Sequence, residues 1–288
     1  MEEKFINKRF GTTAKQLISI VSSVLADYEQ QGYDLSLRQL YYQLVSRNVV
    51  PNTERSYKNV GNLVSDARLA GLLDWAMITD RGREVRTNPH WDNPSDFITS
   101  VAPQYRFDLW ANQKVYVEIM VEKQALEGVL LPVCRKYDVS FTANKGYSSS
   151  SALYEAGKRL QEQSHKNLVV IYLGDHDPSG IDMTRDVMDR LSLFVGSGVT
   201  VRRIALNLDQ VRELNPPENP AKVTDSRAAG YIAKFGRSSW ELDAVEPRRL
   251  VTLVTDAITE VADMALLKRT MEKQRQEREK LIEFAKEF

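Results

Sequence analysis

Apolar residues in the first part of the chain recur with the spacing of amphipathic helices. One such pattern covers residues 12–31, and a second begins at Ser36, where the letters SLRQ fit a capping box completed by Gln39. A third covers residues 53–70 and is followed by a glycine, a common helix terminator. The pattern therefore predicts three consecutive helices before residue 71.

The stretch LLDWAMITDRGREVRTNP, residues 72–89, predicts two short extended segments around an arginine-rich tip. Three helices followed by a hairpin form the order of a winged-helix domain. Basic residues exceed acidic ones between Ser36 and Arg68, as expected for a face that contacts nucleic acid. The contacts that we expect come from the third helix and the hairpin tip, namely Arg55, Lys58, Arg68, Arg81 and Arg83.

Beyond residue 112 the pattern changes to β-branched runs that alternate with helical segments. The runs are residues 114–121, 139–143, 167–174 and 199–206, and the helices between them are expected at 123–136, 149–163 and 181–194. Apolar strands separated by helices indicate a buried parallel sheet and an α/β fold. A proline-rich connector precedes the first run, so we expect two domains, 1–111 and 112–288, with a helical tail from Glu246.

Composition excludes several classes of protein. Lys plus Arg number 39 and Asp plus Glu number 39, so net charge does not identify a polyanionic partner. The single cysteine, Cys134, cannot form an internal disulfide, and we find neither a secretory signal pattern nor an apolar run of membrane-spanning length. No glycine-rich nucleotide loop occurs. We therefore expect a cytoplasmic protein that does not act in a membrane and does not hydrolyse ATP by itself.

Three carboxylates follow two of the predicted strands. Glu122 ends the first strand, and Asp175 and Asp177 follow the third in the stretch LGDHDPSGID. Because the carboxyl ends of parallel strands meet at one edge of a sheet, we expect these side chains to converge. Hard oxygen ligands without His or Cys select Mg²⁺, with Mn²⁺ as the alternative ion. For the Asp pair alone, a capped turn is the competing interpretation.

Three stretches resemble one family of DNA-cleaving proteins. VEKQAL followed by LGDHDPSGID resembles the metal site of the Toprim domain, and LSLRQLYYQL resembles the active-tyrosine helix of the type IIB topoisomerase (topoisomerase VI) A subunit and of the related meiotic double-strand-break transesterase. SWELDAVEPRRL resembles a segment near the C-terminus of those subunits. The resemblance runs from residue 36 to residue 260, and the chain is most similar to the compact bacterial and phage forms. It implies a winged-helix domain followed by a Toprim domain with a helical C-terminal extension.

The resemblance assigns the nucleophile to the second tyrosine of the pair, Tyr42. Helical geometry also separates the two, because Tyr41 falls in the apolar stripe whereas Tyr42 lies one turn beyond Arg38 and outside that stripe. An adjacent guanidinium would favour the phenolate and hold a phosphate, so Arg38 is the expected catalytic partner. For an isolated helical tyrosine, amphipathic packing is the competing interpretation.

The resemblance further implies the reaction and its partners. Tyr42 would attack a phosphodiester of double-stranded DNA to form a 5′-phosphotyrosyl link, with Mg²⁺ held by Glu122, Asp175 and Asp177 and with Glu122 as an alternative general acid or base. The family implies a homodimer in which the tyrosine of one protomer works with the metal of the other, a cytoplasmic, nucleoid-associated location, and a separate GHKL-type ATPase subunit for strand passage. Two alternatives stay open: a Toprim nuclease that uses a metal-activated water, and a non-catalytic winged-helix DNA-binding protein.

Two further features of the sequence remain ambiguous between function and structure. Glu118 shares a strand face with Glu122, which fits a supporting acid, a solvated side chain or a buried ion pair. The polar stretch PPENPAKVTDSR, with Lys222 and Arg227, fits either a DNA-facing loop or a linker.

Overall fold

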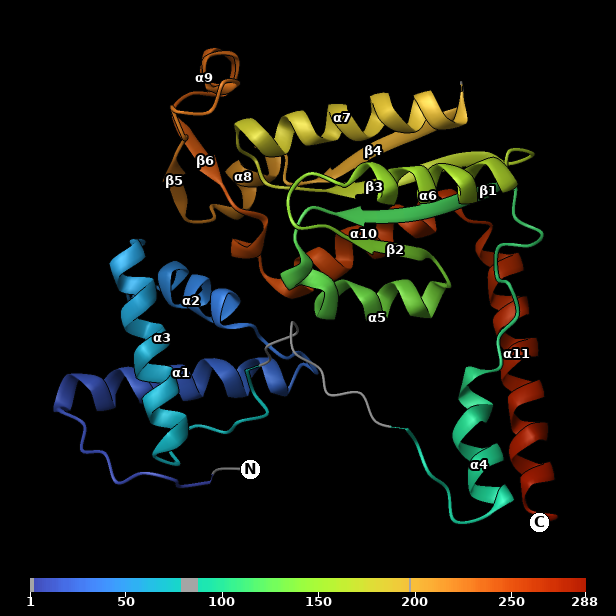
Figure 1. Ribbon diagram of the computed structural model, residues 1–288, viewed down its shortest axis with the longest axis horizontal. Coiled ribbons are helices and arrows are strands. Elements are labelled where there is room, and N and C mark those ends of the chain that lie inside the picture. The colour runs from blue at the N-terminus through green and yellow to red at the C-terminus, as the bar shows by residue number, and fades with distance from the viewer. Residues whose placement is uncertain (1–2, 79–87, 197) are drawn as a thin grey trace.

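The computed structural model describes residues 3–78, 88–196 and 198–288. Within these ranges the chain is an α/β protein with a four-stranded parallel sheet and many helices (Figure 1). None of the helices described in these ranges combines the length and the apolar character that a membrane span requires.

The N-terminal region contains the three predicted helices, α1 (Thr12–Glu29), α2 (Leu37–Ser46) and α3 (Glu54–Leu69). Their apolar faces pack into one cluster, in which Leu40 and Leu44 are fully buried. The capping box at the start of α2 is present, with Ser36 accepting from the Gln39 amide and the Gln39 side chain accepting from the Ser36 amide. The sequence-based prediction of these helices is confirmed.

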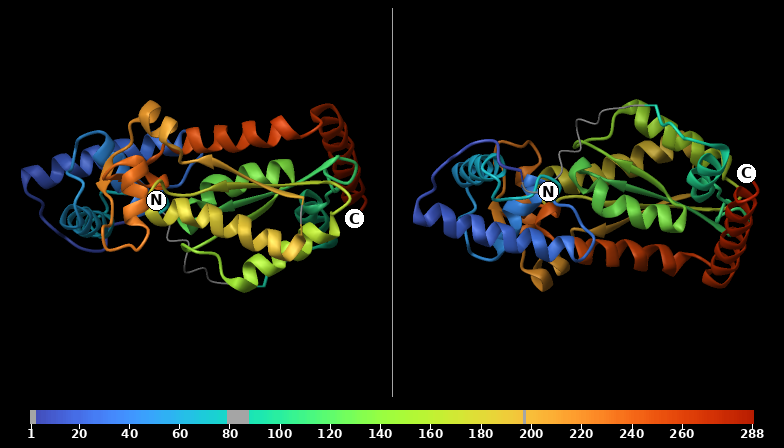
Figure 2. Two further views of the ribbon diagram at one scale, coloured as in Figure 1. Left: turned by 90° about the horizontal axis from the view of Figure 1, so that it is seen from above. Right: turned by 90° about the horizontal axis from the view of Figure 1, so that it is seen from below.

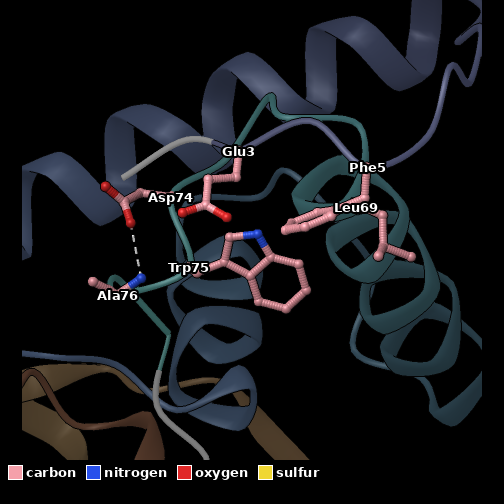
Figure 3. A pocket seen from close by; sticks show the side chains of 6 residues that line it. All are labelled: Glu3, Phe5, Leu69, Asp74, Trp75 and Ala76. Atoms are coloured by element: carbon pink, nitrogen blue, oxygen red, sulfur yellow. Dashed lines mark hydrogen bonds between the residues drawn. The ribbon is translucent and has the colours of Figure 1, made fainter.

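The segment after α3 differs from the prediction. Residues 72–77 form turns and bends instead of a strand, and Ile78 makes a single bridge to Leu35. The physical reason is local, because the Asp74 carboxylate accepts from the Ala76 amide at 2.9 Å and closes a turn (Figure 3). The remainder of the expected hairpin, including Arg81 and Arg83, lies outside the described residues.

The sheet comprises β1 (Val115–Val121), β2 (Ser140–Ala143), β3 (Asn167–Leu173) and β4 (Val199–Ala205), in the order β2-β1-β3-β4. All three pairings are parallel. One face packs against α6 (Ser150–Glu162) and α7 (Pro178–Val195), and the other against α5 (Glu127–Tyr137) and α10 (Pro247–Val261) (Figure 1). The β-branched runs therefore form a sheet buried on both faces, as predicted.

Helix α11 (Met264–Ala285) lies alongside α4 (Pro94–Val101), and Ser95 Oγ donates to the carbonyl oxygen of Ala285 at 2.7 Å. This pair stands at the end of the sheet opposite the N-terminal helices (Figures 1 and 2). The predicted helical tail is thus confirmed as α10 and α11. The remaining elements are short: η1 (Ala102–Gln104), η2 (Gln124–Leu126), α8 (Leu208–Leu214), β5 (Glu218–Pro220), α9 (Ala228–Phe235), β6 (Ser238–Trp240) and η3 (Leu242–Ala244).

The short element η3 joins the two main parts of the molecule. Leu242 is fully buried in the core beneath the sheet, whereas Ala244 is buried in the core of the N-terminal helices. Asn52, just before α3, also donates to the side chain of Asn219 in β5 at 2.7 Å. These contacts hold α2 next to the carboxyl ends of the strands.

Candidate active site

The carboxyl ends of β1 and β3 bring two of the predicted acids together. The strands are neighbours with Val121 opposite Leu173, so the residues that follow them lie side by side. Glu122 Oε2 accepts from the amide of Asp175 at 2.8 Å, and both residues are buried. This proximity is what the alternation of strands and helices led us to expect.

Asp177 takes a different role within the same loop. Its Oδ1 accepts from Ser179 Oγ at 2.9 Å and from the Gly180 amide at 2.6 Å, which makes it the N-cap of α7. The loop is packed so tightly that a Cβ at Gly180 would lie 2.2 Å from the carbonyl oxygen of Asp175. Only glycine fits there, so the loop geometry is fixed by both the cap and the absent side chain.

Five charged side chains connect the acidic loop to α2, and we call them the ion network: Arg38, Lys123, Asp175, Glu241 and Asp243. Lys123 Nζ lies 2.9 Å from Asp175 Oδ2, 2.6 Å from Glu241 Oε2 and 3.2 Å from Asp243 Oδ1. Arg38 pairs with Glu241, and its Nε lies 3.1 Å from Asp243 Oδ2. The network therefore links the tyrosine helix to the sheet edge through two shared acids.

Burial and pairing shift the pKa values in this region in opposite directions. Burial raises the pKa of Asp175 and that of Glu122, and the adjacent Lys123 ammonium opposes both shifts. Burial alone would raise the pKa of Glu241 too, but the adjacent Lys123 and Arg38 outweigh it and lower that pKa to about 2. For Lys123, the three facing carboxylates outweigh desolvation and raise its pKa.

The oxygen atoms of Glu122, Asp175 and Asp177 are suitable ligands for a hard divalent cation. In this structure each of the three carboxylates accepts a hydrogen bond from a backbone amide. Glu122 Oε1 and Asp177 Oδ2 make no hydrogen bond with the described residues, whereas Asp175 accepts from the Leu242 amide at 2.8 Å and pairs with Lys123. Over the described ranges, no group of three or more His, Cys, Asp or Glu residues is disposed to hold a metal ion. The Lys123 ammonium supplies the positive charge beside Asp175, and the three-carboxylate magnesium site stays a prediction.

Tyr41 and Tyr42 are both buried, so burial does not separate them as the helical pattern led us to expect. Their hydroxyl groups differ instead. Tyr41 Oη donates to the carbonyl oxygens of Pro51 and Thr53, at 3.1 and 3.0 Å, and accepts from the Thr53 amide at 2.9 Å. Tyr42 Oη makes no hydrogen bond with any described residue, which leaves it available to a ligand.

Tyr42 lines a hollow of about 400 Å³ next to the ion network. The other lining residues are Arg38, Tyr41, Asn52, Thr53, Glu54, Tyr57, Asn219, Lys222 and Glu241. Burial raises the pKa of Tyr42 to about 12, Glu241 adds to this effect, and Arg38 opposes it only in part. Arg38 thus lowers the pKa of Tyr42, as the sequence led us to expect, but burial raises that pKa by more.

The sequence analysis did not identify Lys123, Glu241 and Asp243 as parts of a site. Lys123 and Glu241 lie within the stretches VEKQAL and SWELDAVEPRRL, so a signal was present, but only the fold shows that these stretches meet. Lys222, from the ambiguous polar stretch, lines the hollow that contains Tyr42, which favours a ligand-facing loop over a linker.

The expected DNA-contacting residues divide into two groups. Arg55 and Lys58 are exposed on α3, and Lys58 pairs with Glu54 at 2.7 Å. Arg68 is half-buried, lies 4.5 Å from the Trp75 ring and donates to the carbonyl oxygens of Trp75 and Ile78, so it stabilises the turn after α3. Trp75 in turn borders a mainly apolar hollow with Phe5 and Leu69 (Figure 3).

Two other residues near the acidic loop have structural partners. The buried Glu118 accepts from Arg159 Nε and Nη2 at 2.9 and 2.8 Å, so of the options that the sequence left open the structure shows the ion pair. His176 is buried with its Nδ1 2.7 Å from Tyr231 Oη, and burial lowers its pKa to about 4.

Comparison of the sequence with models of known protein families and with curated proteins finds no match.

Proposed function

We propose that the chain is a magnesium-dependent DNA transesterase of the topoisomerase VI A-subunit type, with Tyr42 as its nucleophile. One observation carries the proposal: the unbonded hydroxyl of Tyr42 shares a hollow with Arg38 and Lys222, and Arg38 is joined through Glu241 and Asp243 to the acidic sheet edge. In this proposal the residues up to 111 form a winged-helix domain and residues 112–288 a Toprim domain with a helical extension.

The proposed reaction exchanges one phosphoester for another. Tyr42 Oη attacks phosphorus and forms the 5′-phosphotyrosyl bond, the bond from phosphorus to the 3′ oxygen breaks, and the phenolic proton passes to a base. Arg38 and Lys222 line the hollow and would face the negative charge of the phosphate. The positive charges of these two side chains would also favour the phenolate form of Tyr42. Glu241 and Asp243 orient Arg38, since both pair with its guanidinium. A phosphate that draws Arg38 towards it would therefore have to compete with these two acids.

The acidic residues have a separate part in the proposal. Glu122, Asp175 and Asp177 would hold Mg²⁺, which when bound stabilises charge on the phosphate and on the departing 3′ oxygen. Glu122 could alternatively act as the acid that protonates that oxygen. Burial raises the pKa of Glu122, which is the direction that a proton donor requires. Double-stranded DNA, a second copy of the chain and a GHKL-type ATPase subunit are the proposed partners.

The test is the covalent adduct. The protein is incubated with supercoiled DNA and Mg²⁺, denatured and analysed for protein-linked DNA, and Tyr42→Phe is expected to lower the yield by at least about 10⁴-fold. The matched control is Tyr57→Phe, because Tyr57 lines the same hollow and loses the same atom. Tyr42 Oη makes no hydrogen bond with described residues, so the variant should keep its fold.

The outcomes separate the three interpretations. Adducts that vanish only in Tyr42→Phe support the transesterase. Cleavage that survives Tyr42→Phe but stops on chelation of the metal supports a Toprim nuclease. DNA binding without either product, repeated with a candidate ATPase subunit present, supports a non-catalytic DNA-binding protein.

A further inference from the structure

A second charged hollow lies at the far end of the molecule from Tyr42. It has a volume of about 360 Å³, and we call it the basic pocket. Three segments distant in sequence line it, the loop after η1, the last turn of α5 and one face of α11, through Arg106, Arg135, Lys136, Met271, Gln274, Arg275 and Arg278. Five of these seven side chains are cationic, although the chain as a whole has no net charge.

Most of these cations have no acidic partner. Arg275 pairs with Glu272 and Glu279 on its own helix. The other four make no salt bridge with any residue that the structure describes. Arg106 and Arg278 donate to the carbonyl oxygens of Arg135 and Tyr105, at 3.0 and 2.7 Å, which orients the guanidinium groups without neutralising them. The pocket therefore holds about four uncompensated positive charges.

Stabilisation of a helix dipole explains only some of the cations in the basic pocket. Lys and Arg in the last turn of a helix stabilise the helix dipole, which accounts for Arg135 and Lys136 at the end of α5. It does not account for Arg106 in a loop or for Arg278 within α11. Gln274 Oε1 accepts from the Phe107 amide at 2.8 Å and fixes that loop against α11, so the cations are held together despite their mutual repulsion.

The chemistry of the lining identifies the ligand. Guanidinium groups recognise phosphate oxygens through paired donors, and three unpaired guanidinium groups with one ammonium around one hollow favour a ligand with several phosphates. Among the described residues no aromatic ring lines the pocket, so it offers no aromatic platform on which a base could stack. We infer that the basic pocket binds backbone phosphates of nucleic acid without reading its sequence.

This site is distinct from the one around Tyr42. Arg135 and Lys136 precede the start of β2, whereas Glu122 and Asp175 follow the ends of β1 and β3. The seven residues of β1 span about 23 Å, so the two sites are separated by roughly the length of the sheet. The inference does not depend on the proposed transesterase, because a folded chain without any cleavage activity would still carry this pocket.

The test compares two double variants with equal loss of charge. Arg106→Gln with Arg135→Gln removes two pocket cations, and Lys268→Gln with Arg269→Gln removes two exposed cations of α11 that do not line the pocket. Both are made in the Tyr42→Phe background to prevent cleavage. Binding of a fluorescent DNA duplex is measured across a range of salt concentrations, with melting temperatures to establish that each variant is folded.

The pocket variant is expected to bind the duplex about tenfold more weakly at low salt. The slope of log affinity against log salt should fall by about 0.9 for each lost phosphate contact, and two unrelated duplex sequences should give the same result. The control should match the parent. Equal affinity and slope for the two double variants would overturn the inference. Loss of inorganic tripolyphosphate binding with unchanged duplex binding would instead assign the pocket to a free polyphosphate and overturn the nucleic-acid assignment.

Discussion

The ion network and the basic pocket use the same kinds of side chain in opposite ways. In the network, Lys123 and Arg38 face three carboxylates, and the side chain of Asp243 is 0% exposed. In the pocket, four cations have no acidic partner among the described residues. Removing a charge from water costs several kcal/mol, so buried charges persist only when paired, whereas exposed cations keep their hydration and stay available to a ligand. Pairing therefore stabilises the buried charges of the network, whereas the clustering of cations without acidic partners leaves the basic pocket available to an anionic ligand.

The largest effect is expected from breaking the network at Lys123. Lys123→Ala leaves Asp175, Glu241 and Asp243 facing one another with only Arg38 to offset them. Removal of one partner from a buried ionic group costs about 3–5 kcal/mol, and we expect a loss of that size in the free energy of unfolding, measured with urea. The control is Lys58→Ala, since Lys58 is exposed in its pair with Glu54 and should change stability by less than about 0.5 kcal/mol.

The same variant can show whether the acidic edge accepts a cation. With the ammonium removed, Mg²⁺ should stabilise Lys123→Ala more than the parent, and a concentration tenfold above the dissociation constant would restore about 1.4 kcal/mol. The absence of any stabilisation by Mg²⁺ in either protein would argue that these carboxylates do not form a metal site. A loss of stability no larger than that of Lys58→Ala would contradict the interpretation of the network itself.

A smaller effect, dependent on pH, is expected at Glu241. Its pKa is about 2 in the folded protein and 4.5 in the unfolded chain, so the unfolded state binds more protons between these values. The stabilisation is complete above about pH 4.5 and is lost as the pH falls through about 2. Glu241→Gln should therefore cost about 2–3 kcal/mol at pH 7, and the difference from the parent should shrink below pH 4.5.

The measurement is urea unfolding at several pH values between 3 and 7. Glu260→Gln serves as the control, because Glu260 pairs with Arg202 on the surface, with 64% of its side chain exposed. This control should show a small difference that hardly varies with pH. A Glu241→Gln difference that stays constant down to pH 3 would mean that Lys123 and Arg38 do not lower the pKa of this carboxyl.

The sequence predicted local structure and strand order along the chain better than it predicted contacts. The capping box at Ser36 and the strand that ends just before Glu122 rest on neighbouring residues, and both are confirmed. The extended segment predicted after α3 was wrong for residues 72–77, because the bond from the Ala76 amide to Asp74 closes a turn there and Arg68 adds bonds to two later carbonyl oxygens. The pairing of Arg38 with Glu241 depends on how η3 enters the N-terminal core, which no local pattern encodes.

The smallest change in stability is expected at the basic pocket, and this separates the two regions most directly. Arg135 is exposed and makes no ion pair with a described residue, so Arg135→Gln loses little packing and relieves repulsion from Arg106 and Lys136. The helix-dipole contribution at the end of α5 opposes this gain by a few tenths of a kcal/mol. The free energy of unfolding should therefore stay within about 0.5 kcal/mol of the parent while duplex binding weakens. A large loss of stability would mean that this cation, like those of the network, is structural.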